Sequence, residues 1–109
     1  MEKLETMKRN LTGQKQVEDW LANNGFNNVV NNDIEVDGVK GIEANGNIEN
    51  ILVYVKGALH PDLPFKIKPE DKARIKEIAE KQERKAYLAY LVVQDDDKIV
   101  GEISWERLG

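Results

Sequence analysis

The chain has 109 residues, of which 40% are hydrophobic and 33% are charged, and its formal net charge is −4. This composition is typical of one solvated globular domain spanning 1–109, and the acidic balance argues against tight, non-specific binding of nucleic acid. The absence of cysteine excludes disulfide scaffolds, zinc ribbons and thiol nucleophiles. No apolar run approaches the ~20 residues that cross a bilayer, and the acidic N-terminus lacks the apolar stretch of a signal peptide. We therefore expect a cytoplasmic protein with no membrane partner.

A first helix is predicted over about 4–23, with Trp20 and Leu21 covering one face of a central sheet. Gly13 is expected to interrupt this helix, and Gly25 is a suitable residue to end it.

Three strands are predicted next, over 28–36, 39–44 and 51–56. Asp37-Gly38 and Asn45-Gly46 are turn signals of the kind found in hairpins. The third strand is a continuous apolar run, which indicates burial on both faces and hence a central position in the sheet.

A second helix is predicted to begin at Pro69, a residue favoured at the first helical position, with acidic residues in its first turn. Ile75, Ile78, Ala79 and Gln82 mark its inward face. Two further strands are predicted over 86–93 and 99–105, joined by a solvated turn at 95–97.

A helix between two buried strands favours a right-handed crossover and at least one parallel pair. The predicted fold is therefore α/β, with an αβββαβ-type core and a mixed sheet of about five strands flanked by two helices.

One short segment indicates chemistry, because a lysine that closes a buried strand is costly unless it is paired. Alternation places Tyr54 and Lys56 on one face of the third strand. The second strand places Gly41 and Glu43 on one face. If the two strands pair with these faces aligned, Glu43 can lie near Lys56.

This arrangement resembles the core of the PD-(D/E)XK nuclease superfamily, which includes restriction endonucleases and archaeal Holliday-junction resolvases. The segment 54–57 is similar to the acid-X-Lys-Gly motif of that superfamily, with Tyr54 in place of the acid. The segment 41–44 corresponds to the strand that carries a metal-binding Asp. The segment 21–26 is similar to the Leu-X-X-X-Gly-aromatic ending of its first helix, and Gln14 stands where a Glu often precedes it.

The resemblance implies that active members hold a divalent cation with these acids, while the lysine positions water and stabilises developing charge. Here Tyr54 and Gln14 replace two acids, and the third is either Glu43 or, under a two-residue shift, missing at Gly41. Glu18 lies one helical turn after Gln14 and could have taken over the ligand role.

Three hypotheses follow. The first is a catalytically impaired nuclease-like domain without a cofactor, which binds nucleic acid weakly or binds a protein partner. The second is an active endonuclease in which Mg²⁺ or Mn²⁺ is held by Glu43, with Lys56 and Glu18 in the site. The third is an unrelated interaction or oligomerisation domain, in which Glu43 and Lys56 would lie far apart. As alternatives to a role in a site, Lys56 could be a structural remnant and Glu43 a solvated strand residue.

Overall fold

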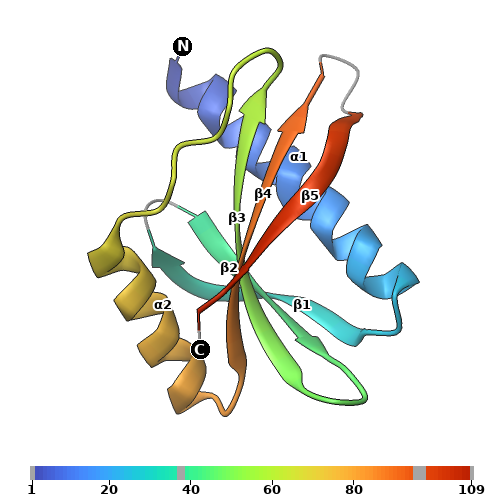
Figure 1. Ribbon diagram of the computed structural model, residues 1–109, viewed down its shortest axis with the longest axis vertical. Coiled ribbons are helices and arrows are strands. Elements are labelled where there is room, and N and C mark those ends of the chain that lie inside the picture. The colour runs from blue at the N-terminus through green and yellow to red at the C-terminus, as the bar shows by residue number, and fades with distance from the viewer. Residues whose placement is uncertain (1, 37–38, 95–97, 109) are drawn as a thin grey trace.

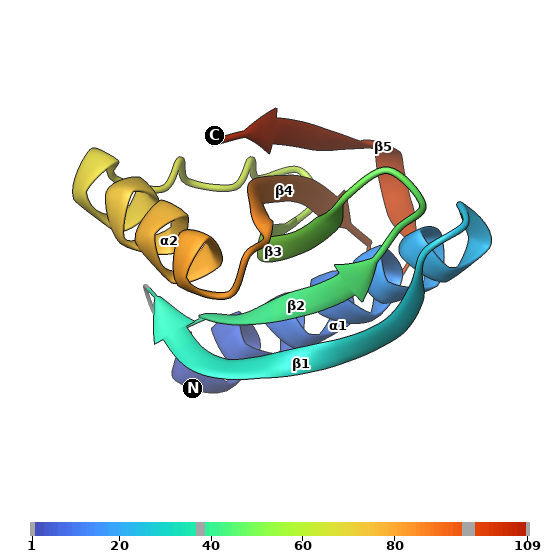
Figure 2. The same ribbon diagram turned by 90° about the horizontal axis from the view of Figure 1, so that it is seen from below.

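The computed structural model describes residues 2–36, 39–94 and 98–108, without the side chains of 2–12, 33, 39 and 40. It shows a five-stranded mixed sheet with one helix on each face (Figures 1 and 2). The predicted α/β fold class is confirmed. The turns predicted at 37–38 and 95–97 lie outside the described residues. Among the described residues, no helix combines the length and the apolar character that a bilayer crossing requires.

Every predicted helix and strand is present, most of them one or two residues longer than expected. The elements are α1 (Glu2–Asn23), β1 (Asn27–Val36), β2 (Val39–Asn45), β3 (Asn50–Leu59), α2 (Pro69–Lys81), β4 (Lys85–Val93) and β5 (Ile99–Arg107).

The predicted interruption of the first helix at Gly13 is wrong, because α1 runs through this residue. Gly13 is buried, and a Cβ atom there would lie 3.3 Å from side-chain atoms of both Leu91 and Val55. The glycine therefore permits a close approach of α1 to the sheet instead of ending the helix.

The spatial order of the strands is the same as their order in the chain. Strands β1, β2 and β3 form an antiparallel meander, β3 pairs with β4 in parallel across the α2 crossover, and β4 pairs with β5 antiparallel. The predicted parallel pair and the predicted antiparallel pairing of β2 with β3 are both confirmed.

The connection between β2 and β3 is longer than the expected two-residue turn at Asn45-Gly46. Asn45 still pairs with Asn50, and the turn is closed by a 3.1 Å hydrogen bond from the Gly46 N–H to the Glu49 carbonyl oxygen. A Cβ atom at Gly46 would lie 2.7 Å from the Phe26 ring, so glycine is required for this ring to pack over the turn.

Each face of the sheet has its own core. Val17 and Leu21 of α1 pack in an aliphatic cluster with Ile42, Ala44, Ile51, Val53, Val55, Ala89, Leu91 and Val93. Ile75 and Ala79 of α2 pack on the other face, with Val36, Leu52, Tyr54, Ile67, Ala86, Leu88 and Tyr90.

Two helix residues are less central than the sequence suggested. Ile78 is only partly buried, whereas Ile75 is fully buried. Trp20 is 39% exposed and packs against Trp105 of the edge strand β5, with 4.9 Å between ring centroids. Leu21 therefore covers the central strands, and Trp20 extends the helix contact to the edge of the sheet.

Candidate functional site

Tyr54 lies in the middle of β3 and is fully buried in the core under α2. Its hydroxyl donates a 2.7 Å hydrogen bond to the backbone carbonyl oxygen of Ile34 in β1. Burial raises the pKa of Tyr54 to about 12, while the nearby Arg74 lowers it and Glu43 raises it. The phenol is therefore neutral at physiological pH and its proton is engaged with the backbone.

Gly41 of β2 is the cross-strand partner of Tyr54. A Cβ atom at Gly41 would lie 3.0 Å from the Tyr54 ring and 2.9 Å from Leu52. The Tyr54 ring thus occupies the space that a side chain at Gly41 would need, so a carboxylate could be accommodated there only if the ring moved.

Glu43 is held in a polar network that joins three elements. One carboxylate oxygen accepts a 2.8 Å hydrogen bond from the Asn32 amide in β1, and the other lies 3.4 Å from the Arg84 guanidinium. The Asn32 amide also donates to Gln82, 3.1 Å away, at the end of α2. A carboxylate with these partners serves as an anchor between β1, β2 and the α2 terminus.

Arg84 extends this network to the β2–β3 hairpin. Its guanidinium donates to the carbonyl oxygens of Ala44 and Ile51 and to the side chain of Asn45, over distances of 3.0–3.3 Å. The planar, multi-donor head of arginine is suited to joining several acceptors.

Glu43 and Lys56 share a face of the sheet, as predicted, but the prediction that they lie close together is wrong. Glu43 is opposite Leu52, and Lys56 lies four residues further along β3. At about 3.3 Å per residue, roughly 13 Å along the strand separates them. The turn that follows Asn45 sets this register. The core packing also holds it, because a shift would move the core residues of β2 or β3 away from their partners.

Gln14 and Glu18 come from α1, which packs on the opposite face of the sheet from Tyr54 and Glu43. Gln14 is 8% exposed, and Glu18 is half-buried. Burial, and secondarily the charge of Asp19, raise the pKa of the Glu18 carboxyl. The structure therefore brings Glu43 and Tyr54 within electrostatic range of each other, whereas Gln14 and Glu18 lie across the sheet from them.

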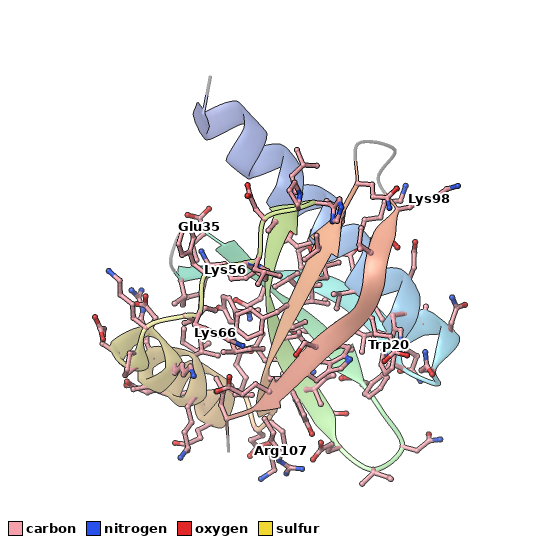
Figure 3. All side chains as sticks on the ribbon, turned by 45° about the horizontal axis from the view of Figure 1, so that its top comes forward. Trp20, Glu35, Lys56, Lys66, Lys98 and Arg107 are labelled. Atoms are coloured by element: carbon pink, nitrogen blue, oxygen red, sulfur yellow. The ribbon has the colours of Figure 1, made fainter. Side chains whose placement is uncertain are left out.

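Lys56 belongs to a different group of side chains, beside Tyr90 of β4. These two residues are partners in the parallel β3–β4 ladder. The Lys66 ammonium lies over the Tyr90 ring, 4.3 Å from its centroid, and the Tyr90 hydroxyl accepts a 3.2 Å hydrogen bond from the Ile67 N–H. Lys56 and Lys66 both lie toward the α2 side of the sheet (Figure 3). We call Lys56, Lys66 and Tyr90 the Tyr90 cluster.

Sequence reasoning did not identify the contacts of Asn32, Arg84 and Lys66. Their roles depend on contacts between residues up to 50 positions apart, such as the hydrogen bond from Asn32 to Gln82. Arg84 follows a helix rich in charged residues, a setting typical of solvated side chains, whereas its own side chain is 17% exposed.

Over residues 2–36, 39–94 and 98–108, no three histidine or acidic side chains gather as a metal site would require. Comparison with models of known protein families gave no match to this chain. Comparison with curated proteins gave no match either. Function is therefore inferred from the geometry of the chain's own residues.

Proposed function

We propose that this domain binds the phosphate backbone of a nucleic acid weakly, at the Tyr90 cluster, and does not cleave it. The observation that carries the proposal is that two lysines adjoin Tyr90: Lys56 is its partner in the β3–β4 ladder, and the Lys66 ammonium lies over its ring. Two lysines next to one buried aromatic residue bring positive charge to one part of the surface, and phosphate neutralisation by lysine supplies most non-specific affinity for nucleic acid.

The site is rigid because Tyr90 is buried and its hydroxyl is engaged by the chain that leads into α2. The Lys66 side chain is ordered over the ring by a cation–π contact. Glu70 and Asp71 occupy the first turn of α2 and offset the positive end of the helix dipole. The lysine side chains are therefore the groups that would contact phosphate.

The residues at the positions of the expected metal-binding acids make other contacts, and these contacts support binding without cleavage. Tyr54 donates a hydrogen bond to a backbone carbonyl, its ring fills the space beside Gly41, and Glu43 is paired with Arg84. A hard cation prefers several carboxylate oxygens, whereas Tyr54 offers a neutral phenol and Glu43 is already paired with Arg84. This arrangement favours the impaired nuclease-like domain over the active endonuclease that uses Glu43, Lys56 and Glu18.

The net charge of −4 removes long-range attraction for phosphate, so affinity should rest on a few local cations. We expect dissociation constants of about 10⁻⁶ M or weaker at physiological salt, because non-specific binding usually lies between about 10⁻⁴ and 10⁻⁶ M.

The test is a fluorescence anisotropy titration with labelled single-stranded, duplex and branched DNA at two salt concentrations. The Lys56→Ala/Lys66→Ala double variant should bind more weakly, and the slope of log affinity against log salt should fall by about two. The matched control is Lys76→Ala/Lys81→Ala, which removes the same charge from the exposed side of α2. Equal losses in the two double variants would show that binding follows net charge alone and would contradict the proposed site.

A nuclease assay with Mg²⁺ and Mn²⁺ on the same DNAs tests the second half of the proposal. We expect no cleavage above background. Cleavage that disappears in Lys56→Ala would establish the active endonuclease instead, and absence of binding to every DNA at low salt would favour a protein-interaction domain.

A further inference from the structure

A cavity of about 260 Å³ lies between the end of α1 and the edge strand β5. Both tryptophans of the chain, one of its two phenylalanines and one of its three tyrosines line it, together with one carboxylate. We call Trp20, Phe26, Tyr87, Trp105 and Glu49 the aromatic cavity. Only 6% of the residues in the chain are aromatic, and most of these line this one cavity.

The cavity lies where α1, which packs on the central strands, reaches the edge strand β5 through Trp20. Trp20 projects from the end of the helix and is 39% exposed, and its ring is inclined at 47° to the Trp105 ring of β5. Figure 3 shows Trp20 on the side of the molecule away from Lys66, beside β5. The cavity is therefore on the opposite face from the Tyr90 cluster.

Glu49 supplies the charge in this aromatic setting. Its carboxylate accepts a hydrogen bond from the Tyr87 hydroxyl and lies 3.4 Å from the Arg107 guanidinium, with a side chain that is 24% exposed. Burial, and then the hydrogen bond to Glu49, raise the pKa of the Tyr87 hydroxyl, so this group stays a donor at physiological pH.

We propose that the aromatic cavity binds a small organic cation carrying a methylated ammonium group. Aromatic faces are electron-rich and attract a cation that cannot be hydrogen-bonded, and tryptophan is the best residue for this purpose. A half-buried carboxylate beside them adds attraction that is stronger than in water, because fewer water molecules screen it. The volume is sufficient for a trimethylammonium head with a short chain and too small for most drug-sized ligands.

Arg107 makes, from within the chain, the same two kinds of contact that the proposed cation would make. Its guanidinium pairs with Glu49 and lies over the Tyr87 ring, 5.7 Å from the centroid. The Arg107 side chain is 49% exposed and its contact with Glu49 is long, so a bound cation can compete with it for the carboxylate. Arg107 therefore acts as an internal competitor that limits affinity.

The experiment is a titration of the full chain with choline, followed by intrinsic tryptophan fluorescence, since both fluorophores line the cavity. We expect a saturable change at millimolar choline. Dimethylbutanol, in which a carbon atom replaces the charged nitrogen, should bind roughly tenfold more weakly or not at all. No saturable response to choline, or an equal response to dimethylbutanol, would overturn the proposal.

Three variants locate the site. Glu49→Gln keeps the side-chain shape and should weaken choline binding roughly tenfold, whereas Arg107→Gln should strengthen it severalfold by removing the competitor. Glu77→Gln on α2 is the matched control and should leave choline affinity unchanged. Because general destabilisation cannot strengthen binding, weaker binding in Arg107→Gln would contradict the assigned role of Arg107.

A last measurement tests whether the ligand is a free small cation or a methylated side chain of another protein. A short peptide containing trimethyllysine carries the same head group as choline. If the peptide bound more than tenfold more tightly than choline, the assignment to a small molecule would be wrong. The outcome is independent of the DNA titrations, because the two sites use different faces of the sheet.

Discussion

The two faces of the sheet are built from the same five strands, yet their cores differ in kind. The buried cluster of the α1 face is aliphatic, with the polar Gln14 beside it, whereas the α2 face buries the hydroxyls of Tyr54 and Tyr90 and borders the Glu43–Arg84 pair. An all-aliphatic core tolerates many substitutions of similar volume, while buried polar groups must each find a partner. The α2 face is therefore the one whose geometry is set by specific pairs, and it is the face that carries the Tyr90 cluster.

The largest expected effect tests the aliphatic face. Leu21→Ala should reduce the free energy of unfolding by about 2–5 kcal/mol, because Leu21 is fully buried between α1 and the sheet. Chemical denaturation measures the change. Ile75→Ala on the other face should cost a similar amount and Ile78→Ala clearly less, and a reversed order of the two isoleucine variants would contradict the packing of α2.

Alkaline titration should distinguish the two faces next. The pKa of Tyr54 is raised from 10 to about 12, so between these pH values the unfolded chain loses the tyrosine proton and the folded chain keeps it. The stabilisation is complete below pH 10 and is lost as pH rises through 12, at up to about 1.4 kcal/mol per pH unit. Denaturation at several pH values should show a steeper decline in the native chain than in Tyr54→Phe. Equal slopes would mean that Tyr54 is accessible to hydroxide in the folded state.

Removal of Arg84 should have a smaller effect. Arg84→Met keeps much of the side-chain length but leaves Glu43 and two backbone carbonyls without their shared donor, and we expect a loss of about 1–3 kcal/mol. Restoring the charge with Arg84→Lys should recover only part of it, since lysine lacks the planar fork. Full recovery by lysine would show that charge alone matters at this position.

The smallest effect is expected at an exposed pair outside both cores. Lys81 lies 3.3 Å from Glu77 one helical turn away, and both side chains are well exposed. Lys81→Ala should change the free energy of unfolding by about 0.5 kcal/mol or less. A larger loss would show that the end of α2 is anchored by more than Arg84 and Gln82.

The sequence predicted the elements well, because their signals are local. Alternating or continuous apolar runs and the Pro69 helix start are readable within short windows. Gly13 misled because a glycine in a helix can either end it or allow close packing, and only the positions of Val55 and Leu91 decide between these.

The candidate site was harder to predict, since it depends on register and on distant partners. The alternation of side chains along each strand was enough to place Glu43 and Lys56 on one face. The distance between them depends on the turn closed by Gly46 and Glu49. The pairing of Lys66 with Tyr90 joins a loop to a strand 24 residues later, and the sequence gives no local sign of it.

The parallel pairing of β3 with β4 also shapes how the chain folds. Residues that become neighbours in this ladder are 34 positions apart, as for Ile51 and Lys85, whereas the β1–β2–β3 meander closes only short loops. Loop-closure entropy must be overcome before this long-range contact contributes, so docking of β4 is expected to limit the folding rate. Until β4 docks, the apolar edge of β3 is open to pairing with other chains. A nascent chain that stops before Lys85 would therefore expose its most aggregation-prone strand.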